Sequence, residues 1–376
     1  MTWSRAIVVT PRYGGADGVS AVTRAYVDAI TRMGIPRVDV WALDEGPQSA
    51  SCSPHAALRT RDRAPRIHSA GGRRLSFASY GLRERGVDGD TLVIVQHVHL
   101  MPPVLPLMAR GARLLLVLHG IEVWTRLRRL ERAACRRAWK LAAVSAHTAR
   151  RFRDANPDLA TLHVDVCAPG LPPRGPANPE AVPGPYALIV ARMQAIERYK
   201  GHDELLEVWP MVREKVPGAR LVIAGGGDDR ERLERKAASL GLERSVQFEG
   251  VVDDGRLQAL YRNAAAFVMP SPNEGFGLVF VEAMRAGIPC IAASGAAEEI
   301  IEHERSGLIV PPRDRALLQR ALIRLLSGDA DRVRMGAAAA AAATRFTDEA
   351  FTARLSILLQ PSGTPVPAMQ ESNVEC

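Results

Sequence analysis

Short apolar runs alternate with longer amphipathic stretches along most of this chain. The apolar runs are five to eight residues long and rich in valine, isoleucine and leucine, which is typical of buried strands. They predict strands at 5–10, 38–43, 90–97, 113–119, 186–191, 220–225, 245–250, 265–270 and 289–293. Apolar residues at helical spacing predict helices that include 19–33, 124–140, 202–215, 229–240 and 316–327, and the alanine run at 336–346 also favours a helix. Such alternation predicts βα units around parallel sheets.

A proline-rich stretch interrupts this pattern near the middle of the chain. Residues 168–185 contain seven prolines, as a linker between domains often does. A chain of 376 residues also suits two domains better than one. The predicted segments are a first Rossmann-like domain at 1–172, a linker at 173–183, a second Rossmann-like domain at 184–345, a helix at 346–360 that packs back on the first domain, and a disordered tail at 361–376.

Composition and charge narrow the class of protein. The chain is 47% hydrophobic and 24% charged, which is typical of soluble globular proteins, and no apolar run is long enough for a signal peptide or a membrane span. Its five cysteines have neither metal-binding nor disulfide spacing, which favours a reducing cytoplasm. Residues 1–180 hold 26 basic and 15 acidic side chains, a net charge of +11, whereas the remainder holds 23 and 26, a net charge of −3. This asymmetry indicates an anionic partner, or equally the arginine usage of a GC-rich genome.

Two glutamates stand out within the apolar stretch NEGFGLVFVEAM at 273–284. On one continuous helix Glu274 and Glu282 would lie about 80° apart around the axis and about 12 Å apart along it. That spacing suits neither a salt bridge nor a carboxylate dyad. The glycines at 275 and 277 instead predict a helix that begins near Gly277, with Glu274 in the preceding loop. Each carboxylate is then placed to contact a different part of one elongated ligand.

Basic side chains follow one of the predicted strands, at the end where open α/β sheets bind their ligands. Arg192 ends the strand at 186–191, and Lys200 lies just before the helix at 202–215. Both are candidates for charge-assisted contacts to a diphosphate, and Arg198 is close enough to replace either. Solvated loop charges of no special function explain the spacing equally well.

Glycines and one histidine also follow predicted strands. Gly14 and Gly15 precede the first helix, and Gly226 lies in a triple-glycine turn before another, so backbone N–H groups there are candidates to bind a phosphate or a ribose. A tight turn needs the same residues, and the two explanations compete. His119 ends the strand at 113–119 and is a candidate to contact a substrate oxygen, although a lone histidine is more often structural.

Motifs for metal binding or covalent catalysis are weak. Asp88 and Asp90 spell DGD, a pattern that binds divalent ions in some enzymes, but Asp-Gly before a strand favours a turn. No other cluster has metal-ligand spacing, and there is neither a GxSxG motif nor a cysteine near a plausible base. We therefore predict no metal site and no protein nucleophile.

In their order along the chain, these segments resemble the family-four retaining glycosyltransferases of the GT-B fold. The resemblance covers about 186–355, and its most specific part is the E-x7-E pair within PSPNEGFGLVFVEAMRAGIP. It also includes ERYKGHDELLEVW (197–209), ARLVIAGGGDDRERLERKA (219–237) and VQFEGVVDD (246–254), with looser matches at GGADGVSAVTRAYVDAI (14–30) and LHGIEVW (118–124). The segment SGAAEEII departs from the family's GG-x-P-E-V-V pattern, and Glu299 aligns with the family's glutamate.

This resemblance implies two Rossmann-like domains that face each other across a cleft, and a role for each candidate residue. Glu282 is expected to bind the ribose hydroxyls of a nucleotide-diphospho-sugar, and Glu274 the hydroxyls of its sugar. His119 is expected to face the reacting sugar. The implied catalytic residues are Glu274, His119, Arg192 and Lys200. The implied donor-binding residues are Gly14, Gly15, Arg192, Arg198, Lys200, Gly226, Gly250, Val251, Glu274, Gly275, Phe276, Gly277, Leu278, Val279 and Glu282.

The implied reaction transfers a hexosyl unit of the mannose or glucose type from a UDP- or GDP-sugar to a hydroxyl of a glycan or a lipid-linked glycan precursor. It retains the anomeric configuration by a front-face mechanism and needs neither a metal nor a permanently bound cofactor. Exopolysaccharide or lipopolysaccharide assembly is the expected setting. The alternatives are a nucleotide-sugar isomerase or epimerase, a phosphorolytic enzyme on the same fold, and a non-catalytic anion binder. Nucleic acid is not an expected partner, because only 5% of the residues are aromatic.

A basic amphipathic stretch at 123–144 predicts contact with a membrane. If it is one helix, an apolar stripe of Trp124, Leu127, Leu130, Ala134, Ala138 and Leu141 faces the core, while a face with seven basic side chains is left for solvent or for anionic lipid headgroups. We expect a cytoplasmic protein that binds the inner face of the cell membrane peripherally and reversibly, without insertion and in a salt-sensitive manner.

Overall fold

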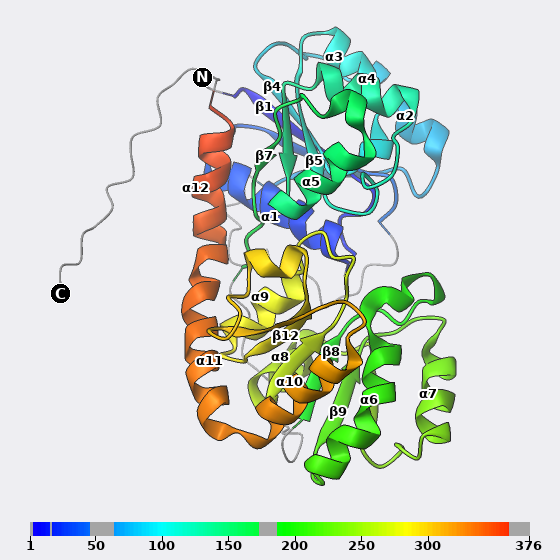
Figure 1. Ribbon diagram of the computed structural model, residues 1–376. Helices are drawn as coiled ribbons and strands as arrows, with labels where there is room; N and C mark the ends of the chain where they lie inside the picture. Colours follow the sequence, from blue (N-terminus) through cyan, green and yellow to red (C-terminus); the bar gives the residue numbers. More distant parts are fainter. Residues whose placement is uncertain (1–2, 16, 46–63, 173–185, 361–376) are drawn as a thin grey trace, which may run out of the picture.

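Two parallel β-sheets, each covered by helices, lie one above the other (Figure 1). The structure is a computed structural model that describes residues 3–15, 17–45, 64–172 and 186–360. The predicted linker at 173–183 and the predicted tail at 361–376 lie outside the described residues, so the proposed domain boundaries stay predictions. The predicted α/β class with two Rossmann-like parallel sheets is confirmed.

The first sheet has the strand order β3-β2-β1-β4-β5-β6-β7, and all its neighbours are parallel. Its strands are β1 (Arg5–Thr10), β2 (Val38–Ala42), β3 (Arg66–Ser69), β4 (Thr91–Val95), β5 (Arg113–Leu118), β6 (Lys140–Ala143) and β7 (Asp165–Val166). Its helices are α1 (Gly18–Arg32), α2 (Arg74–Arg83), α3 (Leu105–Ala109), α4 (Arg129–Arg137) and α5 (Ala146–Ala155). Alternate residues of β1 pack into two different cores, one shared with α1 and the other with α2 to α5. The helices therefore cover both faces of the sheet.

The second sheet has the order β10-β9-β8-β11-β12-β13 and is also wholly parallel. Its strands are β8 (Tyr186–Val190), β9 (Arg220–Ala224), β10 (Val246–Gly250), β11 (Ala266–Met269), β12 (Cys290–Ala293) and β13 (Gly307–Val310). Its helices are α6 (His202–Lys215), α7 (Arg230–Ser239), α8 (Asp254–Asn263), α9 (Leu278–Arg285), α10 (Arg315–Ser327) and α11 (Asp329–Ala343). The order of strands along the chain reverses between β8 and β11, as it does between β1 and β4 in the first sheet.

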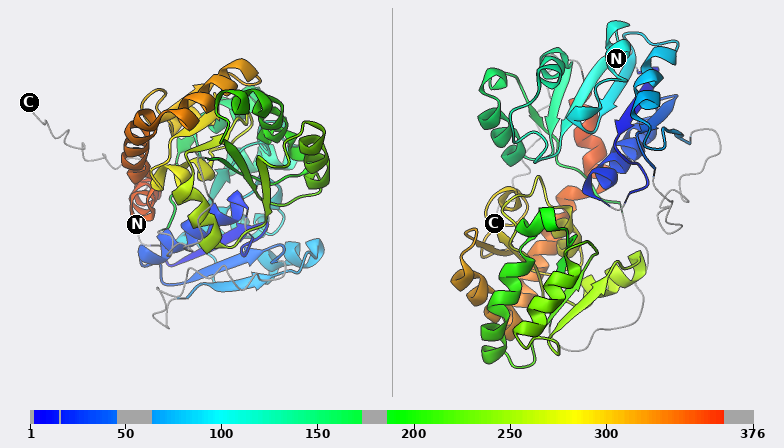
Figure 2. Two further views of the ribbon diagram at one scale, coloured as in Figure 1. Left: turned by 90° about the horizontal axis from the view of Figure 1, so that it is seen from below. Right: turned by 90° about the vertical axis from the view of Figure 1, so that its right-hand side faces the viewer.

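The last helix returns to the first sheet. After α11, a short turn leads into α12 (Asp348–Leu358), which packs against α1 and completes the long column of helix at one side of the molecule (Figures 1 and 2). The rings of Tyr26 and Phe351 meet edge to face, with 5.0 Å between their centroids. Asp348, which is buried, accepts a hydrogen bond from Arg32. The chain thus crosses between the two halves a second time.

All nine predicted strands are present, but the predicted helix at 124–140 is wrong. The helix is confined to Arg129–Arg137, and β6 begins at Lys140 as a strand too short to show its own period beside the arginine-rich helix. β3, β7 and β13 were not predicted either. β3 is an exposed edge strand and β7 has two residues, so neither carries the apolar run of a buried strand.

The proposed apolar stripe at 123–144 is corrected as well. Leu141 lies in β6, and Leu130 is 46% exposed, so neither belongs to a core-facing helix stripe. Part of the basic face is neutralised, because Asp158 forms ion pairs with Arg126, Arg132 and Arg136. Among the described residues, no helix combines the length and the apolar composition that crossing a bilayer requires.

Candidate functional site

The loops that follow β8 and β11 meet where the strand order of the second sheet reverses. At such a point the two loops lead to opposite sides of the sheet, which leaves a crevice at the carboxyl ends of the strands. The loop after β8 carries the predicted basic residues, and the loop after β11 carries Glu274 and leads into α9. The predicted positions at strand ends therefore come together at one edge of this sheet.

One ion pair joins these two loops. The Lys200 ammonium donates to a carboxylate oxygen of Glu274 at 2.8 Å, and the side chains are only 16% and 11% exposed. The Lys200 ammonium also lies 5.3 Å from the ring centroid of Tyr199. Two of the four predicted catalytic residues thus contact each other, with opposite charges held close together and largely screened from solvent.

The other two predicted cations have carboxylate partners of their own. Arg192 donates to Glu197 at 2.6 Å, and Arg198 donates to Asp229 at 3.3 Å. Both guanidinium side chains are 54% exposed, so they remain accessible to a ligand. The Glu197 side chain is buried, and its second oxygen has no hydrogen-bond partner among the described residues. Arg192 is therefore held by a fixed carboxylate.

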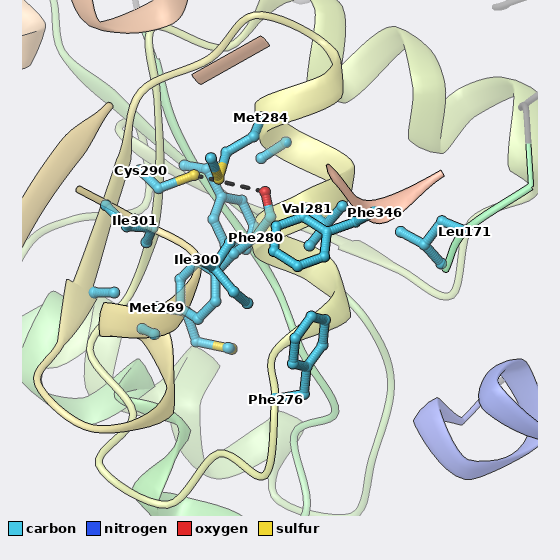
Figure 3. Close-up of a cluster of buried hydrophobic side chains, with 14 of the residues drawn as sticks. Leu171, Met269, Phe276, Phe280, Val281, Met284, Cys290, Ile300, Ile301 and Phe346 are labelled. Atoms are coloured by element: carbon cyan, nitrogen blue, oxygen red, sulfur yellow. Dashed lines mark hydrogen bonds between the residues drawn. The ribbon is translucent and has the colours of Figure 1, made fainter. Parts of the chain in front are cut away.

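The helix α9 begins as the glycines predict. Gly277 is its N-cap with φ of 100°, and a Cβ there would lie 2.6 Å from the ring of Phe280. Figure 3 shows the apolar side chains that anchor this segment, including Phe276 and Phe280, and the ring of Phe276 packs on that of Phe346 at 5.5 Å. These contacts fix the first turn of α9, where backbone N–H groups lack partners within the helix.

Glu282 lies in the second turn of α9, as predicted. It accepts a hydrogen bond of 2.9 Å from the hydroxyl of Tyr261, a buried residue of α8. Leu278 and Val279, at the start of α9, are partly buried. The E-x7-E pair is therefore divided between a loop and a helix, and its two carboxylates have different partners.

The loop that carries Glu274 also contacts the first half of the molecule. A Cβ on Gly275 would lie 1.8 Å from the carbonyl oxygen of His119, so only glycine is tolerated at this approach. The hydroxyls of Ser145 and Thr148, at the start of α5, both donate to the carbonyl oxygen of Gly275. The predicted residues His119 and Glu274 are thereby brought to the same place from different sheets.

A second contact between the halves involves Glu299. Its two carboxylate oxygens accept hydrogen bonds from the backbone N–H groups of Ala146 and His147, at 2.8 and 2.6 Å. These are unsatisfied donors at the N-terminus of α5, where a negative charge is favoured. Glu299 thus caps a helix that belongs to the other sheet.

The side chain of His119 is partly buried and forms hydrogen bonds within the first half of the molecule. Its Nε2 lies 2.9 Å from Oε1 of Gln96, and its backbone N–H donates to Glu122 at 2.6 Å. Burial lowers the pKa of His119 to about 4, against the partly offsetting effect of Glu122. The imidazole is therefore neutral at neutral pH and can form hydrogen bonds without carrying a charge.

Gly14 and Gly15 lie in the loop between β1 and α1. A Cβ on Gly15 would lie within 2.8 Å of side-chain atoms of Arg12, Asp17 and Ser20. Asp17 caps α1, because its carboxylate accepts hydrogen bonds from the backbone N–H and the hydroxyl of Ser20 at 3.0 and 2.8 Å. The α1 N-terminus thus already faces a carboxylate of the chain itself.

The predicted nucleobase region lies farther along the second sheet. The N–H of Gly225 donates to the carbonyl of Gly250 at 2.7 Å, and a Cβ on Gly226 would lie 2.8 Å from the side chain of Val251. Val251 is 85% exposed. The loops after β9 and β10 are therefore adjacent, which places Gly226 beside Gly250 and Val251.

The DGD sequence forms a turn. A carboxylate oxygen of Asp88 accepts hydrogen bonds of 3.0 Å from both the N–H of Asp90 and the hydroxyl of Thr91. In the part of the chain that the structure describes, no group of three or more His, Cys, Asp or Glu side chains is arranged to bind a metal ion.

Four polar residues at the site were not predicted from the sequence. Gln96 contacts His119, Glu197 holds Arg192, and Ser145 and Thr148 hold Gly275. Gln96 directly follows β4 and carries the same signal as His119, a polar residue at the end of a buried strand. The hydroxyls carry no such signal, because their partner is a backbone carbonyl of the other half.

The second half of the chain matches a known family. The model for "Glycosyl transferases group 1" matches residues 180–342, which include Arg192, Lys200, Glu274 and Glu282. These residues make up less than half of the chain, and over them the chain is similar to that family. It is 34% identical over 251 residues to a Mycobacterium tuberculosis protein named GDP-mannose-dependent alpha-(1-6)-phosphatidylinositol monomannoside mannosyltransferase. That match covers 61% of this chain and 65% of the relative, so the chain spans less than two thirds of the relative's length.

A second mycobacterial relative and two solved structures are also similar to this chain. The phosphatidyl-myo-inositol mannosyltransferase of Mycobacterium leprae is 38% identical over 152 residues, which is 40% of each chain. The sucrose-phosphate synthase of Thermosynechococcus elongatus superposes with a TM-score of 0.74 at 20% identity, over 94% of this chain and 98% of that one. HepE of Anabaena, in a complex with UDP and glucose, gives a TM-score of 0.73 at 17% identity, over 94% and 99%. The protein therefore has the GT-B fold.

Proposed function

We propose that this protein is a retaining glycosyltransferase that moves a hexosyl unit from a nucleotide-diphospho-sugar to an acceptor hydroxyl. The observation that carries the proposal is the contact between Lys200 and Glu274 at the switch point of the second sheet, beside the N-terminus of α9 and next to His119. A cation, a helix N-terminus and a carboxylate within one small region suit a ligand with a diphosphate at one end and hydroxyls at the other.

The proposed donor pose follows from this arrangement. Lys200 and Arg192 offset the charge of the diphosphate, with Arg198 as an alternative, and the first turn of α9 directs its N–H groups from Phe276 to Val279 toward the phosphates and the sugar. The diphosphate exchanges the Lys200–Glu274 pair for a Lys200–phosphate contact, and the carboxylate of Glu274 then accepts hydrogen bonds from the donor sugar.

The remaining parts of the donor lie along the same edge of the sheet. Glu282 accepts hydrogen bonds from the two ribose hydroxyls, and the nucleobase lies near Gly250 and Val251. Gly14 and Gly15 close over the diphosphate from the first half of the molecule. In this pose the Asp17 carboxylate moves away from the diphosphate, because two anions at one helix N-terminus repel each other.

The proposed reaction is a front-face displacement without a protein nucleophile. The bond between the anomeric carbon and the leaving phosphate oxygen breaks, and the acceptor oxygen attacks from the same face. The leaving diphosphate takes the proton of the acceptor hydroxyl, so charge and atoms balance without a metal or a further cofactor. Lys200 and Arg192 stabilise the negative charge that grows on the diphosphate, and neutral His119 forms a hydrogen bond to the reacting sugar.

The relatives suggest which donor and acceptor to test first. The M. tuberculosis relative is named for GDP-mannose and for a phosphatidylinositol mannoside. We propose GDP-mannose as the first donor and a lipid-linked glycan as the first acceptor, with UDP-glucose as the second donor. A lipid-linked acceptor would place the enzyme at the inner face of the cell membrane, in the assembly of a cell-surface polysaccharide or glycolipid.

A panel of nucleotide sugars tests the proposal. The purified protein is incubated with UDP- and GDP-hexoses, with and without glycan acceptors, and the released nucleotide diphosphate and the state of the donor sugar are measured. Nucleotide diphosphate released from one donor, faster with an acceptor, is the expected result. Epimerised donor in the absence of acceptor would favour an isomerase, and binding without turnover of any donor would favour a non-catalytic anion binder.

A further inference from the structure

Helix α2 carries leucines on the side that faces away from the protein. Leu75 is 89% exposed and Leu82 is 72% exposed, the two highest values among the described large apolar side chains in the half that contains the first sheet. The opposite side of α2 is anchored in the core by Phe77, whose side chain is 3% exposed. A Cβ on Gly81 would lie 1.9 Å from the carbonyl oxygen of Pro103, so α2 also packs tightly on the turn before α3. The orientation of α2 is therefore fixed.

The positions around this helix follow from its period. At 100° per residue, Leu75 and Leu82 both lie about 150° around the axis from Phe77, and they are about 10 Å apart along it. Arg74 and Arg83 lie about 90° to either side of these leucines. Both arginines are exposed, and neither has an ion pair within the described ranges 3–15, 17–45, 64–172 and 186–360. The outward side of α2 is thus an apolar ridge with a cation on each flank.

A ridge of exposed leucines flanked by arginines is more favourable at the surface of an anionic bilayer than in water. Apolar side chains at the outer pole enter the acyl region, while flanking arginines reach the phosphates of the headgroups. A helix that is apolar on two opposite faces is normally covered on both, and here only the Phe77 face is covered by the described residues. α4 belongs to the same helix layer (Figure 1) and adds the exposed cations Arg128, Arg129 and Arg137.

We propose that α2 is the element through which this protein enters the surface of an anionic membrane, with Leu75 and Leu82 inserted and Arg74 and Arg83 bound to lipid phosphates. The proposal rests on the proposed function in one respect, because membrane binding through α2 would bring the enzyme to a lipid-linked acceptor. It changes the expectation from the sequence, which was purely electrostatic binding through the stretch at 123–144. With leucines inserted, part of the binding persists at high salt, since salt screens only the arginine contacts.

The test is sedimentation of the full chain with vesicles of phosphatidylcholine alone or with added phosphatidylglycerol, at low and at high salt. The variants are Leu75→Ser/Leu82→Ser and Arg74→Gln/Arg83→Gln. The matched control is Val333→Ser/Ile357→Ser, which replaces apolar side chains that are 74% and 49% exposed elsewhere on the surface. Circular dichroism and turnover of the donor without vesicles show that each variant is folded and active.

We expect wild type to bind the anionic vesicles, and the leucine variant to bind at least about tenfold more weakly at both salt concentrations, as loss of two inserted side chains requires. The arginine variant should lose only the salt-sensitive part of binding, so that its binding at low salt equals the weaker binding of wild type at high salt. The control should match wild type. Equal binding of wild type and the leucine variant, or no binding of wild type, would overturn the proposal. So would a wild-type dimer that the leucine variant dissociates, because a second copy would then cover α2. Vesicle binding without turnover of any donor would leave this proposal standing and refute the proposed function.

Discussion

Replacing Lys200 by alanine removes the cation from the ion pair at the switch point. In the free protein the variant leaves the carboxylate of Glu274, which is 11% exposed, without the partner it contacts at 2.8 Å. Leaving a largely buried acceptor unpaired costs about 1–3 kcal/mol of folding stability. In the reaction the same variant removes a fixed positive charge from the leaving diphosphate, and loss of one such preorganised group costs about 2.7–4 kcal/mol in the transition state. The expected fall in kcat/KM is therefore about 10²–10³-fold.

The assay is the initial rate of nucleotide diphosphate release across a range of donor concentrations, with thermal unfolding as the measure of stability. Arg198→Ala is the matched control, because it removes a cation from the same loop that pairs with Asp229 and not with Glu274. We expect Arg198→Ala to lose much less activity than Lys200→Ala. If Lys200→Ala keeps its kcat while Arg198→Ala loses it, the role at the diphosphate belongs to Arg198 and the reasoning about the Lys200–Glu274 pair is refuted.

Three further predictions concern the carboxylates, the contact between the halves, and pH. Glu274→Ala should lower kcat strongly, whereas Glu282→Ala should mainly weaken binding of free nucleotide diphosphate by calorimetry; equal losses of binding in both would show that the roles are not divided. Gly275→Ala should lower kcat by at least about 100-fold while nucleotide binding persists, because the new Cβ would lie 1.8 Å from the His119 carbonyl oxygen. Gly218→Ala is the control, because no atom lies within 4 Å of a Cβ at that position. Burial lowers the pKa values of His97, His119 and His202 to about 4 in the folded protein. The unfolded chain takes up these protons at higher pH than the folded protein does, so the urea midpoint of unfolding should fall as the pH drops from about 6.5 to about 4. Above pH of about 6.5 these histidines should not affect the midpoint. A midpoint that stays constant between these pH values would contradict the burial of the three histidines.

Much of the fold was predictable, because parallel strands that are buried on both faces have continuous apolar sequences. All nine predicted strands exist, and the start of α9 follows from Gly277. The edge strand β3 is exposed along its length, and β6 is four residues long and begins shortly after an arginine-rich helix, so neither carries a period of its own. Sequence patterns therefore find the centre of each sheet better than its edges.

The site was predictable as far as each residue belongs to a strand end or to a glycine-rich loop. Lys200 and Glu274 were placed at the correct edge of the sheet, but the ion pair between them depends on how two loops fold toward each other. The hydrogen bond from Ser145 to the carbonyl oxygen of Gly275 could not be predicted. A hydroxyl that binds a backbone group far away in the sequence produces no recognisable residue spacing. The exposure of the α2 leucines was not predicted either, because it depends on which side of the helix packs against the core, and only the structure shows this.

The most direct test of the central claim is the NMR spectrum of the anomeric signals during a reaction with GDP-mannose and a glycan acceptor. We expect the α-anomeric signal of the donor to be replaced by that of an α-linked product as GDP is released. A β-linked product would contradict the front-face mechanism, and an epimerised donor without any new linkage would contradict transfer itself.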